Sequence, residues 1–362
     1  MSKRFHAYAF FLIGINAIIS ILRPSAAFAT TFYFDPSATL NGIGTQARPF
    51  NTWKSVSFQP GNTYLQRAGT TYPGLLALFS VQGTASQPVT IDSYGTGAPP
   101  IVTNVVLFDN SSYIIFRNFT VTTVSSYPSI VLRNGSTHIT VNNNSITNAA
   151  ASGIFLMGNG CNNVIANNTI HDVAADVIDV NQVVCTNKSQ ILIYGNTIYN
   201  AGIHGIELDG SFLIIDYNVI HDSGRTSAGT SGIHIFGGGF QNSQPDGMGN
   251  NNLVLNNVVY HAHEPLYHDG NGIQCDSYTH NNQIYNNLIF GNDGMGINLY
   301  DSKNNQVHDN TLFGNVVNTI GKYFDPRWNI TNGTSAAHAH TANASTNNNF
   351  TYNVIIPSLP TF

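Results

Sequence analysis

The chain has 362 residues, only 9% of them charged, and its 13 basic and 18 acidic residues give a net charge of −5. A chain this poor in lysine and arginine offers no basic patch to collect phosphates, which argues against nucleic acid as a partner. Asparagine, glycine, serine and threonine abound instead. Such a surface relies on neutral hydrogen-bonding groups and suits a protein that faces carbohydrate outside the cell.

Residues 1–29 have the features of a secretory signal. A charged start is followed by a largely apolar run over residues 10–22 and by Ala27-Phe-Ala29, an A-x-A cleavage site. The apolar run is short for a membrane span, and no second run follows. We expect a secreted or periplasmic protein that starts at Thr30, has no membrane contact and carries a net charge of −8 from 10 basic and 18 acidic residues.

Residues 30–60 are rich in turns and carry few repeated features. Because a solenoid needs an atypical first unit to cover the open end of its core, we expect these residues to form an N-terminal cap. Short β-type runs begin near Gly61 and become regular from residue 112 to about residue 315. The period is lost from Thr319, so residues 319–362 are expected to form a C-terminal cap or tail.

One asparagine recurs through the regular part, each time followed by an aliphatic pair. It returns after 22 to 39 residues, at Asn144, Asn168, Asn196, Asn218, Asn257, Asn287 and Asn310. A repeat of this size, with strands of three to five residues and Asn or Gly at the corners, indicates a β-solenoid in which each coil buries its apolar face against its neighbours. We expect the asparagines to hydrogen-bond to one another in a ladder, which makes them scaffold.

Three other features follow from stacking the coils. Cys161 and Cys185 lie at corresponding corners of consecutive coils, which are about 4.8 Å apart, so a disulfide is expected in an oxidising compartment. Cys275 falls on an inward position and is predicted to be a buried free thiol. His171 and His221 share a column with Tyr199, Tyr260, Phe290 and Phe313, which predicts a stack of rings rather than a catalytic role.

Two coils are longer than the rest. The coil at residues 211–250 carries two insertions, and the next carries the segment 261–268. Loops that leave a β-helix on one side build the walls of a groove, and loops on a rigid scaffold often carry function. The middle of the chain is therefore the place to look for a site.

Carboxylate, imidazole and amide side chains cluster on one strand of each coil, the strand that begins with Gly-Ile or a similar pair. Strand alternation points every second residue of this strand outward. The first outward column contains Phe155, Asp179, Glu207, His234, Gln274 and Asn298; the second contains Met157, Asn181, Asp209, Phe236, Asp276 and Tyr300; the residues just before the pair include Asp176, His204, Ser231 and Asn271. An ordinary solvated face would mix Thr, Ser, Lys and Asn, so this pattern favours a functional cleft over a face that happens to be acidic.

Three carboxylates in this cleft are expected within one rung of each other, those of Asp179, Glu207 and Asp209. Carboxylates this close repel, so either one is protonated with a raised pKa or a cation lies among them. Oxygen-rich acidic groups suit Ca²⁺, and we expect calcium as the cofactor.

With these features the chain resembles the secreted parallel β-helix carbohydrate-active enzymes of the pectate-lyase-like superfamily, over residues 30–315. The resemblance implies an all-β, right-handed, single-stranded parallel β-helix and is less specific for the reaction. The Asp-Pro-His-Glu motif of alginate epimerases is absent, and His263-Glu-Pro265 is only a partial echo of it. The paired Asp and Gly-His-Gly motifs of polygalacturonases are also absent.

The leading function implied by the resemblance is a polysaccharide lyase that cleaves a uronic-acid polymer by β-elimination. Such a lyase needs a neutraliser for the uronate carboxylate, a base and an acid. Ca²⁺ on the three carboxylates, helped by Arg225, is the expected neutraliser. His234 or His204 is the expected base, with Glu207 beside them, and Tyr300 or His268 the expected acid. The predicted substrate contacts are Arg225, Asn271, Gln274, Asp276 and Asn298.

Other functions stay open for a monomer of this type that binds an anionic polysaccharide. A glycoside hydrolase could use Asp179 with Glu207 as a retaining pair one rung apart, or Asp209 with Asp276 as an inverting pair two rungs apart. A uronan epimerase and a non-catalytic carbohydrate-binding or adhesin module are the remaining alternatives.

Overall fold

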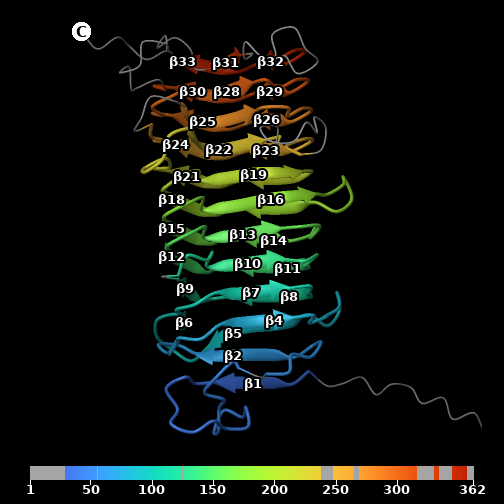
Figure 1. Cartoon of the computed structure of the whole chain (residues 1–362), viewed down its shortest axis with the longest axis vertical. Helices are drawn as coiled ribbons and strands as arrows, with labels where there is room; N and C mark the ends of the chain where they lie inside the picture. Colours follow the sequence, from blue (N-terminus) through green and yellow to red (C-terminus); the bar gives the residue numbers. More distant parts are fainter. Residues whose placement is uncertain are drawn as a thin grey trace, which may run out of the picture.

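The computed structural model describes residues 29–54, 56–123, 125–237, 248–264, 269–315, 330–333 and 345–356. Their strands stack in three parallel sheets along one axis, with the N-terminal coil at the bottom and the C-terminal coil at the top of Figure 1. No helix in this part of the chain is long and apolar enough to cross a membrane. Residues 1–28, which hold nearly all of the predicted signal, lie outside the described residues.

Each sheet consists of equivalent strands from successive coils. The twelve-stranded sheet contains β1 (Thr31–Phe34), β2 (Thr63–Arg67), β5 (Val89–Tyr94), β8 (Ser112–Arg117), β11 (Thr137–Asn142), β14 (Val164–Ala166), β17 (Ile191–Tyr194), β20 (Leu213–Asp216), β23 (Leu253–Leu255), β26 (Gln283–Tyr285), β29 (Gln306–His308) and β32 (Asn349–Thr351). The eleven-stranded sheet contains β3 (Thr71–Tyr72), β6 (Ile101–Val102), β9 (Thr120–Thr122), β12 (Ser145–Ala149), β15 (Thr169–Val173), β18 (Thr197–Ala201), β21 (Val219–His221), β24 (Val258–Tyr260), β27 (Leu288–Phe290), β30 (Thr311–Phe313) and β33 (Val354–Ile356). The ten-stranded sheet contains β4 (Leu76–Phe79), β7 (Val106–Asp109), β10 (Ile130–Arg133), β13 (Ile154–Met157), β16 (Ile178–Val184), β19 (Ile206–Ser211), β22 (Thr230–Phe236), β25 (Asp269–Asp276), β28 (Ile297–Tyr300) and β31 (Ile330–Gly333).

A coil passes through the three sheets in turn. The strands β11, β12 and β13 pair in parallel with β14, β15 and β16 of the next coil. Inward side chains such as Ile154 and Leu156 are buried, while the alternating Phe155 and Met157 point outward. The period-2 pattern therefore builds one continuous apolar core inside a stack of coils, which confirms the predicted parallel β-helix.

The recurring asparagine forms the predicted ladder. The Asn168 side-chain amide donates to Asn196 Oδ1 at 3.0 Å and to the Val141 carbonyl at 2.9 Å. The same bonds link the other members, Asn144, Asn218, Asn257, Asn287 and Asn310. A second ladder, which the sequence reading missed, runs through Asn252, Asn282, Asn305 and Asn348. Both ladders satisfy buried amide and carbonyl groups at the corners of the coils.

The two ends of the solenoid differ. The segment expected as the N-terminal cap supplies β1 and the ring of Trp53, which stacks on Phe34 at 3.7 Å in the buried core. The described parts of the segment expected as a C-terminal cap or tail form one more coil. They add β31, β32 and β33, one strand to each sheet, and Asn353 extends the asparagine ladder from Asn310.

The remaining scaffold predictions are confirmed. Cys161 and Cys185 form a disulfide with 5.7 Å between their Cα atoms, and Cys275 is a buried free cysteine. His171 and His221 lie in one stack of rings, each nearly parallel to the Tyr199 ring between them. The stack continues through Tyr260, Phe290 and Phe313. His171 stacks on Tyr199, and His221 is sandwiched between Tyr199 and Tyr260, so both histidines stabilise the packing of adjacent coils.

Candidate active site

The ten-stranded sheet brings the predicted outward column into register. Its residues pair from coil to coil in the order Ala77, Leu107, Val131, Phe155, Asp179, Glu207, His234, Gln274 and Asn298. The second column joins Met157, Asn181 and Asp209, and farther along Phe236 and Asp276. The polar residues of both columns therefore face the same side of the sheet, on its middle coils.

Glycines hold this register. Gly205 precedes β19, and a Cβ added there would lie 2.5 Å from the Gly232 carbonyl oxygen and 2.5 Å from Ile220 Cγ2. Gly232 is restricted in the same way by Val259 Cγ1 at 2.4 Å. Only glycine lets the backbones of adjacent coils approach this closely, which explains the Gly-Ile pairs that begin the strands.

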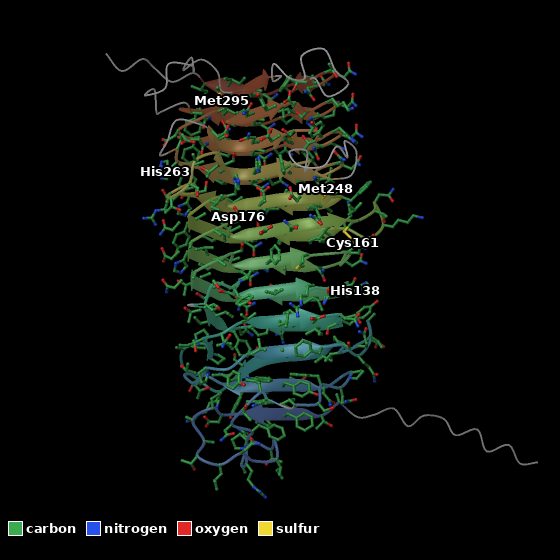
Figure 2. All side chains as sticks on the ribbon, in the orientation of Figure 1. His138, Cys161, Asp176, Met248, His263 and Met295 are labelled. Atoms are coloured by element: carbon green, nitrogen blue, oxygen red, sulfur yellow. A yellow bond between two sulfur atoms is a disulfide. The ribbon has the colours of Figure 1, made fainter. Side chains whose placement is uncertain are left out.

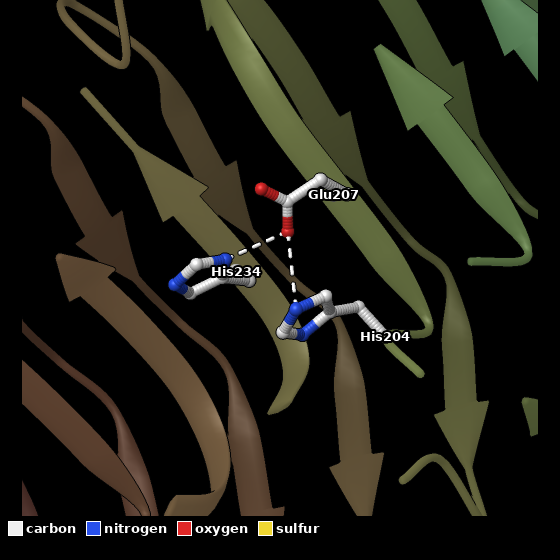
Figure 3. A group of neighbouring side chains, drawn as sticks. All are labelled: His204, Glu207 and His234. Carbon is white, nitrogen blue, oxygen red and sulfur yellow. Dashed lines mark hydrogen bonds and ion pairs between the residues drawn. The ribbon is translucent and has the colours of Figure 1, made fainter. Parts of the chain in front are cut away.

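Glu207 lies at the centre of a hydrogen-bonded group with two histidines, as Figure 3 shows. Its Oε2 accepts a hydrogen bond from His234 Nδ1 at 2.7 Å and lies 3.4 Å from His204 Nε2. The two imidazole rings are stacked, with centroids 4.4 Å apart and planes within 9°. We call Asp176, Asp179, His204, Glu207, Asp209, His234 and Asp276 the acid–histidine cluster; Asp176 is labelled on this face in Figure 2.

His204 is neutral in this arrangement. Its Nδ1 accepts a hydrogen bond from the Ser231 backbone N–H at 3.0 Å, so that nitrogen carries a lone pair and the proton resides on Nε2, toward Glu207. Burial lowers the pKa of His204 to about 4, against the raising effect of the Glu207 charge. With both ring nitrogens engaged, His204 orients Glu207 and has no free lone pair to act as the predicted base.

His234 is the charged member of the pair. Burial works to lower its pKa, but Glu207 on one side and Asp276 on the other raise it well above its usual value. The His234 Nε2 lies 3.6 Å from Asp276 Oδ2, and Asp276 is itself held by the Ser277 backbone N–H at 2.7 Å. An imidazolium between two carboxylates donates protons, which argues against His234 as the base and favours it as an acid.

The cluster contains one group of three side chains whose ligand atoms all lie within 4.8 Å of one another in the described part of the chain, that of His204, Glu207 and His234. An imidazole binds a metal in its own ring plane, because the lone pair lies there. Two stacked, nearly parallel rings share no common point in both planes, so these rotamers do not direct both nitrogens at one ion. The three side chains are held together by the contacts of the two imidazole rings with Glu207 Oε2.

The expected calcium ligands lie within one rung of each other, as predicted: Asp179 is on β16, and Glu207 and Asp209 are on the adjacent β19. Asp179 pairs in register with Glu207, but Asp179 and Asp209 do not join Glu207 in a close three-ligand group among the described residues. The Oδ1 atoms of both aspartates are buried without a hydrogen-bond partner. A buried carboxyl oxygen without a protein partner favours the protonated carboxyl group, or a water molecule or ion beside it.

Burial and mutual repulsion keep these aspartates protonated near neutral pH. Burial first, then the charges of Asp176, Glu207 and Asp209, raise the pKa of Asp179 to about 8. Burial and the Glu207 charge raise the pKa of Asp209 to about 7. Glu207 behaves in the opposite way: burial acts to raise its pKa, but His234 and His204 beside it together lower it. The cluster therefore combines ionised and neutral carboxyl groups on one face.

Amide side chains form the next layer above the cluster. Gln274 Oε1 accepts hydrogen bonds from the Ser231 hydroxyl and from the Asn271 side-chain amide, each at 2.8 Å. Gln274 Nε2 donates weakly to Asp276 Oδ2 at 3.4 Å. Asn271 and Gln274 are nearly fully buried. These two predicted substrate contacts therefore orient Asp276, the acid that pairs with His234.

The other predicted site residues lie in several places. Asn298 follows Gln274 in the outward column, and Tyr300 ends β28, one strand beyond Asp276, with 36% of its surface exposed. Arg225 lines a separate pocket at the turn before the ten-stranded sheet, close enough to Asp172 to help lower that pKa. His268 lies outside the described residues.

Two acids were not assigned a role from the sequence. Asp176 accepts a hydrogen bond from the His204 backbone N–H at 2.9 Å, and burial with the Glu207 charge raises its pKa to about 6. Asp269, at the start of β25, also has a raised pKa because of burial. Asp176 precedes its strand at the same position as His204, so aligning the coils was enough to predict that the two residues are neighbours. Asp269 lies just before a register shift between β22 and β25, which hides it from such an alignment.

Comparison with known proteins supports the handedness of the coils. Residues 104–258 match the family model described as the right handed beta helix region. The fold is a right-handed parallel β-helix. No curated protein matches the sequence.

Solved structures share this right-handed β-helix at low sequence identity. An alginate lyase from Paenibacillus sp. str. FPU-7 superposes with a TM-score of 0.57 and 16% identity, over 90% of this chain and 99% of that chain. The A-module of the mannuronan C-5 epimerase AlgE4 from Azotobacter vinelandii gives 0.54 and 15%, over 83% and 90%. The Dettilon tailspike protein gives 0.51 and 13%, over 82% and 56%. Similarity at these identities establishes the fold and leaves the reaction to the site.

Proposed function

We propose that the protein is a secreted polysaccharide lyase that cleaves a uronic-acid polymer by β-elimination on the acid–histidine cluster. The observation that carries the proposal is that one face of the sheet holds both an imidazolium, His234, and two buried carboxyl groups, Asp179 and Asp209, whose Oδ1 atoms have no partner. Elimination needs a neutraliser, a base and an acid, and these three groups offer one of each. An alginate lyase and a mannuronan epimerase among the structures of similar fold support the substrate class.

The roles follow from the protonation states. Asp179, neutral below a pKa of about 8, donates a hydrogen bond to the substrate carboxylate and so makes the adjacent C–H more acidic. Asp209, ionised above a pKa of about 7, removes that proton. The freed electron pair forms the new C=C bond as the glycosidic C–O bond breaks. The leaving oxygen takes its proton from His234 Nε2, which Asp276 orients.

Glu207 and His204 act as positioning residues in this scheme. Glu207 fixes the His234 ring through its 2.7 Å hydrogen bond and keeps the imidazolium charged. His204 occupies the other side of Glu207 Oε2. Removing either one leaves the reacting groups in place but lowers the population of correctly oriented, protonated His234.

A calcium ion is the alternative neutraliser of the substrate carboxylate. The orphaned Oδ1 atoms of Asp179 and Asp209 fit an oxygen-preferring cation, and such a cation would neutralise the uronate carboxylate in place of a proton. Metal dependence distinguishes the two neutralisers, because activity that relies on protonated carboxyl groups survives chelation.

A glycoside hydrolase is the second candidate, and one observation favours it. Asp179 and Glu207 are register partners on adjacent strands, about 4.8 Å apart, with the first neutral and the second ionised. Two carboxyl groups whose pKa values are pushed apart at this separation match the acid and nucleophile of a retaining glycosidase.

The test is a product analysis. The purified protein is incubated with anionic and neutral polysaccharides, with and without EDTA, while ultraviolet absorbance of the unsaturated product and new reducing ends are followed. We expect both signals together on a uronate polymer. Reducing ends without absorbance would assign the hydrolase, a changed uronate composition without new ends the epimerase, and binding without any product the non-catalytic module.

A further inference from the structure

A pocket lies on the same sheet as the cluster, at its N-terminal end. Here the segment after Trp53 and the strand β4 enclose a pocket of about 860 Å³. Its wall includes the side chains of Lys54, Phe58, Leu75, Ala77, Phe79 and Gln82. Figure 1 shows β4 near the bottom of the ten-stranded sheet and β19, which carries Glu207, above it on the same face.

The register ties this pocket to the cluster. Ala77 belongs to the same outward column as Asp179 and Glu207. Five strand spacings separate β4 from β19, in the order β4, β7, β10, β13, β16 and β19. At about 4.8 Å each, they place the pocket roughly 24 Å from Glu207 along the solenoid axis. Several linked sugar units of an extended chain can span that distance.

The pocket offers apolar surface together with one positive charge. Phe79 is 59% exposed and Leu75 is 45% exposed, so both can cover the C–H face of a sugar ring. Lys54 is exposed and has no carboxylate within 4.0 Å among the described residues. By contrast, three arginines of the same half are each paired with an aspartate, namely Arg67, Arg117 and Arg133. The Lys54 ammonium is therefore available to an anion.

The distribution of charge along the chain favours binding of an anionic polymer over the N-terminal coils, where this pocket lies. Residues 30–150 contain five basic and three acidic residues, a net charge of +2, whereas residues 151–318 contain three basic and fourteen acidic residues, a net charge of −11. A polyanion lying over the C-terminal coils meets repulsion, and one lying over the N-terminal coils does not. The outward residues between the pocket and the cluster, Leu107, Val131 and Phe155, carry no charge.

We propose that the pocket is a distal subsite for the anionic sugar units of the same polymer that reacts at the cluster, so that the substrate extends from Glu207 toward the N-terminal end. The proposal rests on the polyuronate substrate proposed above. Phe79 and Leu75 bind the apolar face of a sugar unit, and Lys54 binds its carboxylate.

The experiment compares chain lengths. The variants Phe79→Ala and Lys54→Ala are assayed for binding and turnover on a long polyuronate and on a tetrasaccharide cut from it, which is too short to reach the pocket. We expect a roughly tenfold higher Kd and KM on the polymer for each variant, with kcat and all tetrasaccharide values unchanged. Lys188→Ala, an exposed lysine of the acidic half, is the matched control and should alter neither substrate.

The outcomes separate this subsite from the reaction. Length-dependent loss of binding without any elimination product would overturn the lyase and keep the subsite. Elimination with equal kinetics for both variants and the wild type would overturn the subsite alone, as would equal losses on polymer and tetrasaccharide. Both side chains are exposed, and thermal unfolding of each variant identifies a folding defect; Lys54→Glu, which reverses the charge, should then weaken polymer binding more than Lys54→Ala.

Discussion

The lower and upper halves of the ten-stranded sheet share one backbone arrangement and differ in the side chains on its outward face. The lower half, β4 to β13, has the outward residues Ala77, Leu107, Val131 and Phe155; the upper half, β16 to β25, has Asp179, Glu207, His234 and Gln274. The inward residues of both halves are buried and apolar, and nearly all are aliphatic. The coils therefore fix where side chains stand, and the outward residues alone change the chemistry.

Two aspartates make this difference concrete. In the lower half, Asp109 accepts hydrogen bonds from Asn134 and Arg133, and these contacts hold its pKa below the usual value despite partial burial. In the upper half, Asp179 has an unpaired buried oxygen and a pKa raised by burial to about 8. The scaffold thus pairs Asp109, which serves stability, and leaves one oxygen of Asp179 in the cluster without a partner, at a cost in folding energy.

Replacing one acid in each half should separate these roles, with the largest effect in the upper half. Asp209→Asn removes the proposed base and should lower kcat/KM by about 10²- to 10⁴-fold. Its melting temperature should stay the same or rise, because a neutral amide replaces an acid that is poorly satisfied when ionised. Steady-state kinetics and thermal unfolding measure both quantities.

The matched change in the lower half is Asp109→Asn. It should leave kcat/KM unchanged and lower the free energy of unfolding by about 0.5–1 kcal/mol, since it weakens a partly exposed pair with Arg133. Full activity in Asp209→Asn would remove Asp209 from the mechanism. A large loss of activity in Asp109→Asn would show that the lower half takes part in the reaction itself.

The asparagine ladder should stabilise both halves alike. Asn144→Ala in the lower half and Asn257→Ala in the upper half each remove buried bonds to a carbonyl and to the next asparagine. Because the former partners stay buried, each change should cost about 2–4 kcal/mol in the free energy of unfolding. Chemical denaturation measures the cost; a difference of several kcal/mol between the two sites would contradict a shared scaffold. Asn353→Ala, at the ladder end, should cost less.

Much of this architecture could be predicted from the sequence because it repeats. The spacing of Asn144 and its equivalents gave the coil length, and the Gly-Ile pairs then placed Asp179 and Glu207 on adjacent strands, as the register confirms. The second ladder through Asn252 and Asn282 repeats with the same spacing as the first, so it could also have been predicted from the sequence.

The protonation states of the cluster could not be read in the same way. They depend on contacts that no spacing encodes, such as the Ser231 N–H that binds His204 Nδ1. Two stacked histidines of neighbouring coils thus acquire opposite pKa shifts, His204 down and His234 up. The spacing also placed Asp179, Glu207 and Asp209 within one rung, but adjacent positions on a sheet do not specify which way three carboxylates turn, so calcium binding stays a prediction.

The smallest predicted effect concerns pH and tests the protonation states directly. Activity needs Asp209 ionised and Asp179 protonated, so kcat/KM should rise as the pH passes about 7 and fall as it passes about 8. In Asp179→Asn the side-chain amide donates a hydrogen bond at every pH. The upper limb should therefore move to higher pH by about one unit or more, while the lower limb stays with Asp209.

Stability gives an independent check on the same aspartate. The folded pKa of Asp179, about 8, lies above its ordinary value of 3.8, so the folded state binds the extra proton and its contribution is lost as the pH rises from 3.8 through about 8. The free energy of unfolding should fall less steeply over this range in Asp179→Asn than in the wild type. An upper kinetic limb that stays near 8 in a variant with the flatter stability profile would assign that limb to another group, and Asp179 would then be an unpaired acid of the upper half that does not take part in the reaction.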